Sequence, residues 1–126
     1  MLTTKQPMAT VAVRDLAAAR RFYEEKLGLT PPSGPSQPGT AIYRCGGAEL
    51  LVYQSGLGGS NRATAVSWRV GDDIGDIARA LAAKGVAFEH YEMPNVRMDG
   101  DVHVFGTHRV AWFTDPDGNI HSLVNA

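Results

Sequence analysis

One pattern of local signals occurs twice along the chain, once in each half. Residues 8–13 form a short β-prone run, and Asp15 then precedes apolar residues at helical spacing as far as Gly28. Residues 64–70 form a second such run, followed by two aspartates and another helical pattern that ends at Gly85. This repetition restricts the chain to folds that are built from two similar halves.

A hairpin pattern follows each predicted helix. The first surrounds a Gly46-Gly47 turn, and the second surrounds Asp-Pro-Asp-Gly at 115–118. The four strand-like segments are residues 40–44, 49–53, 109–114 and 120–124.

We therefore predict an α+β fold of two βαβββ modules in one domain over residues 1–126. The modules span about 6–55 and about 62–125, and their curved mixed sheets form a cup with the helices on the outside. The expected helices lie near residues 16–27 and 74–84, and the expected long loops are residues 30–39 and 93–106.

Composition excludes several classes of partner and compartment. Twelve basic and 13 acidic residues leave a net charge of -1 without a run of one sign, which argues against nucleic acid and membrane surfaces. No segment approaches the roughly 18 apolar residues of a membrane span, and residues 1–7 lack the apolar core of a signal peptide. The single cysteine, Cys45, excludes an intrachain disulfide, and we expect an inert thiol in a cytoplasmic protein.

Two motifs resemble those of the glyoxalase, bleomycin-resistance and dioxygenase (vicinal oxygen chelate) superfamily, and the resemblance covers nearly the whole chain. They are Val-Arg-Asp-Leu at 13–16 leading to Phe-Tyr-Glu-Glu-Lys-Leu-Gly-Leu at 22–29, and Phe-Thr-Asp-Pro-Asp-Gly-Asn at 113–119. The resemblance implies the fold and leaves the activity open, because the superfamily includes isomerases, dioxygenases and proteins that sequester antibiotics.

Metal-dependent members of this superfamily carry a histidine seven residues before the capping aspartate and a glutamate four residues after the turn glycine. The corresponding residues here are Met8, Leu51, Ala65 and Ser122. None is a histidine or a carboxylate, and a divalent ion needs several such ligands. A slip of one residue in the last strand would offer only His121. We therefore predict no metal and no cofactor in the cup.

Strand alternation extends these positions to a set of candidate ligand-binding residues. The set is Met8, Tyr43, Glu49, Leu51, Tyr53, Arg69, Trp112 and Ser122, with Thr10, Ser67 and Ile120 on the same side. Such a lining suits an organic ligand with a flat apolar body and a few polar groups. The alternative for Glu49 and Arg69 is that they are solvated strand residues.

The remaining aromatic and imidazole side chains favour structural roles. Trp68 is expected to pack toward the helices. His103 and His108 are expected at the surface of a loop, and His90 and His121 as packed or surface histidines, His121 on the helix side.

Three functions remain open, and whether the chain is an enzyme is uncertain at this point. The leading hypothesis is a metal-independent protein that binds a small, planar or aromatic organic ligand, resembling the bleomycin-resistance branch. The second is a lyase, isomerase or dioxygenase-type enzyme with Glu49 as base, Arg69 stabilising an oxyanion and Tyr43 or Tyr53 as acid. The third is an interaction subunit with a vestigial pocket. A homodimer is expected in each case.

Overall fold

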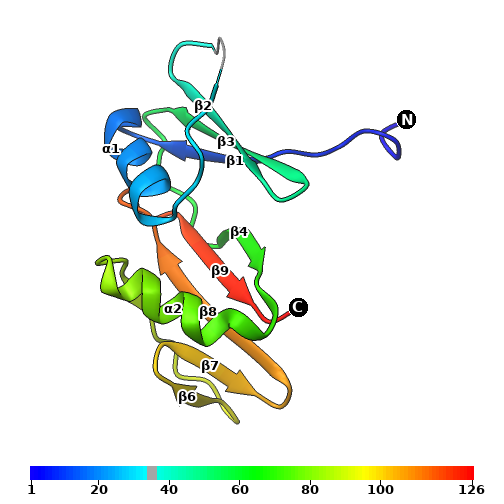
Figure 1. The fold of residues 1–126 in the computed structure, drawn as a ribbon, viewed down its shortest axis with the longest axis vertical. Coiled ribbons are helices and arrows are strands. Elements are labelled where there is room, and N and C mark those ends of the chain that lie inside the picture. Colours follow the sequence, from blue (N-terminus) through cyan, green and yellow to red (C-terminus); the bar gives the residue numbers. More distant parts are fainter. Residues whose placement is uncertain (34–36) are drawn as a thin grey trace. The chain divides into compact units, whose positions relative to one another are not determined.

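The computed structural model describes residues 1–33 and 37–126, and its chain divides into two compact units. Unit 1 is Met1–Gly58 and unit 2 is Gly59–Ala126. Each contains a β-sheet with a helix against one face (Figure 1). Within the described ranges, no helix is long and apolar enough to cross a membrane.

The described residues of unit 1 form three strands and one helical segment. The strands are β1 (Ala9–Val13), β2 (Thr40–Cys45) and β3 (Ala48–Gln54); the helical segment is α1 (Leu16–Arg20), which continues as the π-helix η1 (Arg21–Lys26). The sheet order is β1-β3-β2, with β1 parallel and β2 antiparallel to β3. Asp15 caps the helix through a 3.2 Å hydrogen bond from Ala18 N, and Gly28 follows the helix with φ of 74°.

The two faces of the unit 1 sheet differ in burial. The face against the helical segment is buried and apolar, and it consists of Val11, Val13, Ala41, Tyr43, Leu50 and Val52. The other face, called here the helix-free face of unit 1, carries Thr10, Ile42, Arg44, Glu49, Leu51 and Tyr53. This alternation is what a sheet produces when only one of its faces packs into a core.

Unit 2 contains a larger sheet and a longer helix. Its elements are β4 (Thr64–Arg69), the 3-10 helix η2 (Gly71–Asp73), α2 (Ile74–Ala83), β5 (Phe88–Glu89), β6 (Arg97–Asp99), β7 (Val102–Phe105), β8 (His108–Thr114) and β9 (Ile120–Val124). The sheet order is β4-β9-β8-β7-β6, and β5 pairs with β8. The β4–β9 pair is parallel and the other pairs are antiparallel.

Helix α2 lies along one face of this sheet, over β7, β8 and β9 (Figure 1). It buries Ile74, Ala78 and Leu81, and the sheet contributes Val102, Ala111, Phe113, His121 and Leu123 to the core. The opposite face, the helix-free face of unit 2, carries Ser67, Arg69, His103, Trp112 and Ser122.

The α+β class with two mixed sheets is confirmed, and the strand count needs correction. Among the described residues of unit 1 only two strands follow the helix, so this unit is βαββ. In unit 2, the loop predicted at residues 93–106 contains the β6–β7 hairpin. The hairpin forms because Gly100 takes a φ of 62° at the turn and because Val102 packs in the core.

Candidate functional site

Trp112 lies at the centre of the helix-free face of unit 2. It stands opposite Ser122 in the β8–β9 pair, and Ser122 stands beside Ser67 in the β9–β4 pair. Ser122 Oγ donates a 2.8 Å hydrogen bond to Ser67 Oγ. The exposed Arg69, two residues further along β4, forms no ion pair with a described residue. The register thus brings together three predicted residues, Arg69, Trp112 and Ser122.

An aromatic cluster holds Trp112 in place. Its ring meets His103 edge-on at a centroid distance of 4.8 Å and Tyr91 at 5.2 Å. His103 Nε2 accepts a 2.9 Å hydrogen bond from the backbone N–H of Tyr91, so the ring proton belongs on Nδ1, which lies 3.3 Å from Val110 O. Burial lowers the pKa of His103 and keeps the ring neutral, in agreement with these roles.

The prediction that His103 lies at the surface of a loop is wrong. The side chain is fully buried in β7. Residues 102–105 are the β-prone run Val-His-Val-Phe, which follows Asp-Gly at 99–100, and this hairpin signal was available in the sequence. Tyr91, in contrast, had no local signal, because it reaches the cluster through a segment without regular structure. His108 is exposed, as predicted.

The predicted position of Tyr43 is also wrong. Tyr43 pairs with Leu50 and therefore lies on the buried face of unit 1, against the helical segment. Its hydroxyl donates a 2.8 Å hydrogen bond to Glu24, and its ring stacks on Tyr23. Burial raises the pKa of Tyr43, and the hydrogen bond from Arg20 lowers the pKa of Glu24. Tyr43 is thus a core residue whose hydroxyl proton is held in the hydrogen bond to Glu24.

The other predicted residues of unit 1 share the helix-free face, as the alternation indicated. Glu49, Leu51 and Tyr53 occupy alternate positions of β3, and Thr10 lies beside Leu51. Met8 immediately precedes β1 and is exposed.

The residues at the expected metal positions do not fit a divalent ion. Met8 and Leu51 offer no nitrogen or oxygen side-chain ligand, Ala65 offers none, and the Ser122 hydroxyl is already bonded to Ser67. In residues 1–33 and 37–126, no three His, Cys, Asp or Glu side chains are grouped so that they could hold an ion.

Two further histidines make polar contacts with another side chain. At the surface, His90 Nε2 lies 2.6 Å from Asp101 Oδ1. His121 faces the helix side, as predicted, and its Nδ1 accepts a 3.0 Å hydrogen bond from the Trp68 indole. Trp68 also packs on this side, stacked on the His121 ring.

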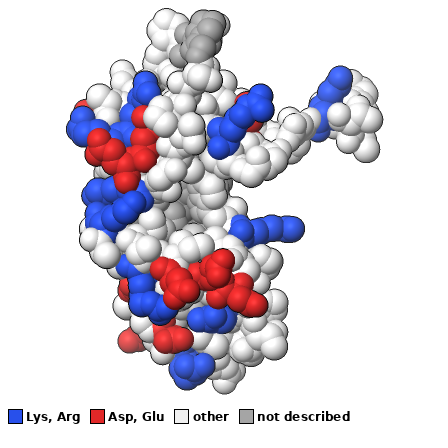
Figure 2. All heavy atoms as spheres, in the orientation of Figure 1, with Lys and Arg blue, Asp and Glu red and all other residues white. Residues whose placement is uncertain are grey.

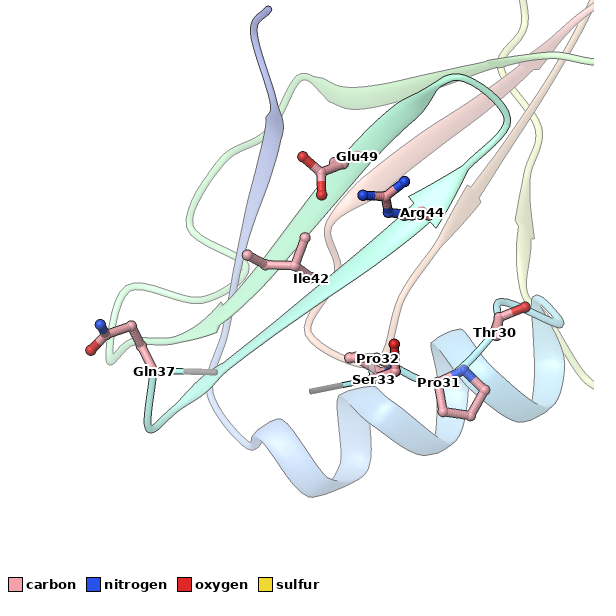
Figure 3. Close-up of a pocket in the computed structure, with 8 residues that line it drawn as sticks. All are labelled: Thr30, Pro31, Pro32, Ser33, Gln37, Ile42, Arg44 and Glu49. Carbon is pink, nitrogen blue, oxygen red and sulfur yellow. The ribbon is translucent and has the colours of Figure 1, made fainter. Parts of the chain in front are cut away.

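Unit 1 contains a cavity of about 640 Å³ beside its helix-free face (Figure 3). Its lining residues are Thr30, Pro31, Pro32, Ser33, Gln37, Ile42, Arg44 and Glu49. Of these, only Glu49 was a predicted site residue. Its volume lies within the range of small-molecule sites.

Charge is distributed without a dominant sign. On the face drawn in Figure 2, both Lys or Arg and Asp or Glu side chains occur over each unit. This mixture agrees with the net charge of -1, and on the face drawn it leaves no continuous basic track for a phosphate backbone.

Comparison with known proteins places this geometry in a family. The model of the Glyoxalase/Bleomycin resistance protein/Dioxygenase superfamily matches residues 5–122. The chain belongs to this superfamily. No curated protein matches the sequence.

Solved structures share the fold over almost their whole length. An integron cassette protein from the mobile metagenome of the Halifax Harbour sewage outfall has a TM-score of 0.70 and 19% identity, with 98% of this chain and 99% of that chain covered. A bleomycin resistance determinant encoded on the transposon Tn5 has a TM-score of 0.69 and 22% identity, with 96% of this chain and 97% of that chain covered. TnmS3, an antibiotic binding protein from Streptomyces sp. CB03234, has a TM-score of 0.68 and 24% identity, with 98% of this chain and 96% of that chain covered.

Proposed function

We propose that this superfamily member binds a small organic ligand with a planar or aromatic body, without a metal, on the helix-free face of unit 2. The observation that carries the proposal is Trp112, a half-buried indole whose orientation is fixed by edge contacts with His103 and Tyr91. A ring held in this way loses little side-chain entropy when a flat ligand stacks on it.

Polar groups around Trp112 would orient such a ligand. Arg69 offers an exposed guanidinium without an ion-pair partner among the described residues, and Ser67 offers a hydroxyl. An apolar ring with a few polar neighbours is the usual composition of a small-molecule site. TnmS3 is described as an antibiotic binding protein, and its likeness in fold supports a binding role here.

Four of the predicted ligand-binding residues lie in unit 1, where they form a separate candidate surface. They are Met8, Glu49, Leu51 and Tyr53, on or next to the helix-free face of that unit. Tyr43 is removed from the set because it lies in the core.

Replacing Trp112 with alanine is expected to weaken ligand binding by about 1–3 kcal/mol, by analogy with aromatic stacking on nucleic-acid bases. Mass spectrometry of compounds that copurify with the protein would supply the ligand, and titration calorimetry would give its affinity. The matched control is Trp68→Phe, because Trp68 is the other tryptophan of the chain and lies on the helix side of the sheet, away from the proposed ligand. Trp68→Phe also leaves Trp112 as the sole tryptophan, so its fluorescence should respond to the ligand. Unchanged affinity in Trp112→Ala would place the ligand elsewhere.

Metal independence has its own test. Protein purified without a histidine tag is expected to contain well below one equivalent of transition metal per chain, because the superfamily positions lack ligands. A chelator should leave the melting temperature and ligand affinity unchanged. A stoichiometric metal whose removal lowers either quantity would contradict the proposal.

We also propose that two copies of the chain associate as a homodimer. Unit 1 exposes the apolar side chains of Leu2 and Leu57, and a partner surface would cover such groups. Light scattering at micromolar concentration is expected to give twice the mass of 13.5 kDa. A monomer mass would count against this assembly.

A further inference from the structure

The unit 1 cavity carries two opposite charges on neighbouring strands. Arg44 in β2 and Glu49 in β3 are register partners, so their side chains leave the sheet on the same face. Both line the cavity and both are exposed. Figure 3 shows them side by side, with Ile42 nearby on the same hairpin.

These two charged groups are not neutralised by ion pairs with other described residues. Neither Arg44 nor Glu49 forms an ion pair with the other or with any other described residue. Partners in an antiparallel pair have Cα atoms about 4.5–5.5 Å apart, which places the two charged groups within reach of one small molecule. A cation and an anion this close match a ligand that carries both charges a few bonds apart.

The rest of the lining is suited to the body of such a ligand. Ile42 provides an apolar surface on the strand side, and the rings of Pro31 and Pro32 lie on the opposite wall (Figure 3). Thr30, Ser33 and Gln37 add neutral hydrogen-bonding groups. The cavity thus combines a guanidinium that can bind a carboxylate, a neighbouring carboxylate that can bind an ammonium group, and apolar side chains in the rest of its lining.

We propose that this cavity binds an amino-acid-type zwitterion with an apolar side chain. The ligand carboxylate pairs with the Arg44 guanidinium, for which a two-pronged geometry is available, and the ligand ammonium pairs with the Glu49 carboxylate. The apolar side chain lies against Ile42 and the two prolines. This site lies within unit 1 and uses none of the unit 2 residues around Trp112.

The test uses three related probes in titration calorimetry with the full chain: L-phenylalanine, phenethylamine and phenylpropionate. The two latter compounds lack the carboxylate and the ammonium group, respectively. Because both protein charges are exposed, each pair is worth up to about fivefold in affinity. L-phenylalanine is therefore expected to bind up to about fivefold more tightly than either analogue, and the difference should shrink at high salt.

Two substitutions assign the charges. Arg44→Gln should abolish the advantage of L-phenylalanine over phenethylamine, and Glu49→Gln should abolish its advantage over phenylpropionate. Arg97→Gln, at an exposed position of β6, is the matched control and should change neither ratio. Circular dichroism melting would verify that each variant folds.

The outcomes separate this site from the proposed Trp112 surface. Trp112→Ala should leave the affinity for L-phenylalanine unchanged, whatever its effect on a copurified ligand. The zwitterion site is refuted if L-phenylalanine produces no binding heat at millimolar concentration, if all three probes bind equally, or if neither Arg44→Gln nor Glu49→Gln changes the ratios.

Discussion

Asp115→Ala is expected to lower the free energy of unfolding by about 3 kcal/mol or more, since it would leave two buried donors and one half-buried donor without an acceptor. Asp115 is buried at the turn between β8 and β9. Its Oδ1 accepts 2.9 Å hydrogen bonds from the backbone N–H groups of Asp117 and Asn119, and its Oδ2 accepts a 2.8 Å hydrogen bond from Asn119 Nδ2. Alanine removes both acceptor oxygens, and with them all three hydrogen bonds, and leaves the donors in place.

Urea unfolding at neutral pH would measure this loss. Asp72→Ala is the matched control, because Asp72 is an exposed aspartate in η2, between β4 and α2, and it is expected to change stability by less than about 0.5 kcal/mol. Asp115→Asn keeps one acceptor oxygen, so its loss of stability should lie between those of Asp115→Ala and Asp72→Ala. Equal stability of Asp115→Ala and the wild type would mean that water replaces the carboxylate at the turn.

The same turn explains why much of the fold was predictable from the sequence. Asp115 bonds to residues two and four positions later, so its role is encoded within one short segment. The Asp15 cap and the helix-ending Gly28 are equally local. Features of this kind determine where strands and helices begin and end, and these were the features that the sequence predicted well.

The errors arose where a residue's position depends on a distant partner. Tyr43 was assigned to the wrong face because its direction follows from its pairing with Leu50 across the Gly46-Gly47 turn, and a shift of one residue reverses the face. His103 was placed at the surface because its main polar partner, the Tyr91 N–H, lies 12 residues away in sequence. The Arg44–Glu49 pair was missed because the facing cavity wall comes from residues 30–33 and 37, which form no regular structure.

His121 supplies the second large effect, a loss of stability in mild acid. Its ring is fully buried, stacked on Phe113 at 4.9 Å, and its Nδ1 accepts the hydrogen bond from Trp68. Burial lowers its pKa from 6.5 to about 4 because an imidazolium would lose its hydration there. An accepting Nδ1 also requires the neutral ring, with its proton on Nε2.

The direction of the pH effect follows from proton binding. Between pH 6.5 and 4 the unfolded chain takes up a proton at His121 that the folded chain does not, so the free energy of unfolding falls as the pH decreases. The loss is about 2 kcal/mol between pH 7 and 5, and it approaches about 3 kcal/mol at pH 4. His103, whose pKa is also lowered by burial, contributes in the same direction.

Urea unfolding at several pH values from 7 to 5 would isolate the His121 contribution in a His121→Phe variant. Phenylalanine keeps a ring for the stack on Phe113 and removes the titrating group, at a cost of about 1 kcal/mol for the lost hydrogen bond from Trp68. The variant should therefore be less stable at pH 7, yet lose about 2 kcal/mol less than the wild type on going to pH 5. His108→Phe, at an exposed histidine, should retain the wild-type slope. If the free energy of unfolding changes with pH equally in His121→Phe and in the wild type, then His121 takes up its proton in the folded chain as readily as in the unfolded chain. The buried stack would then not exclude a charged ring.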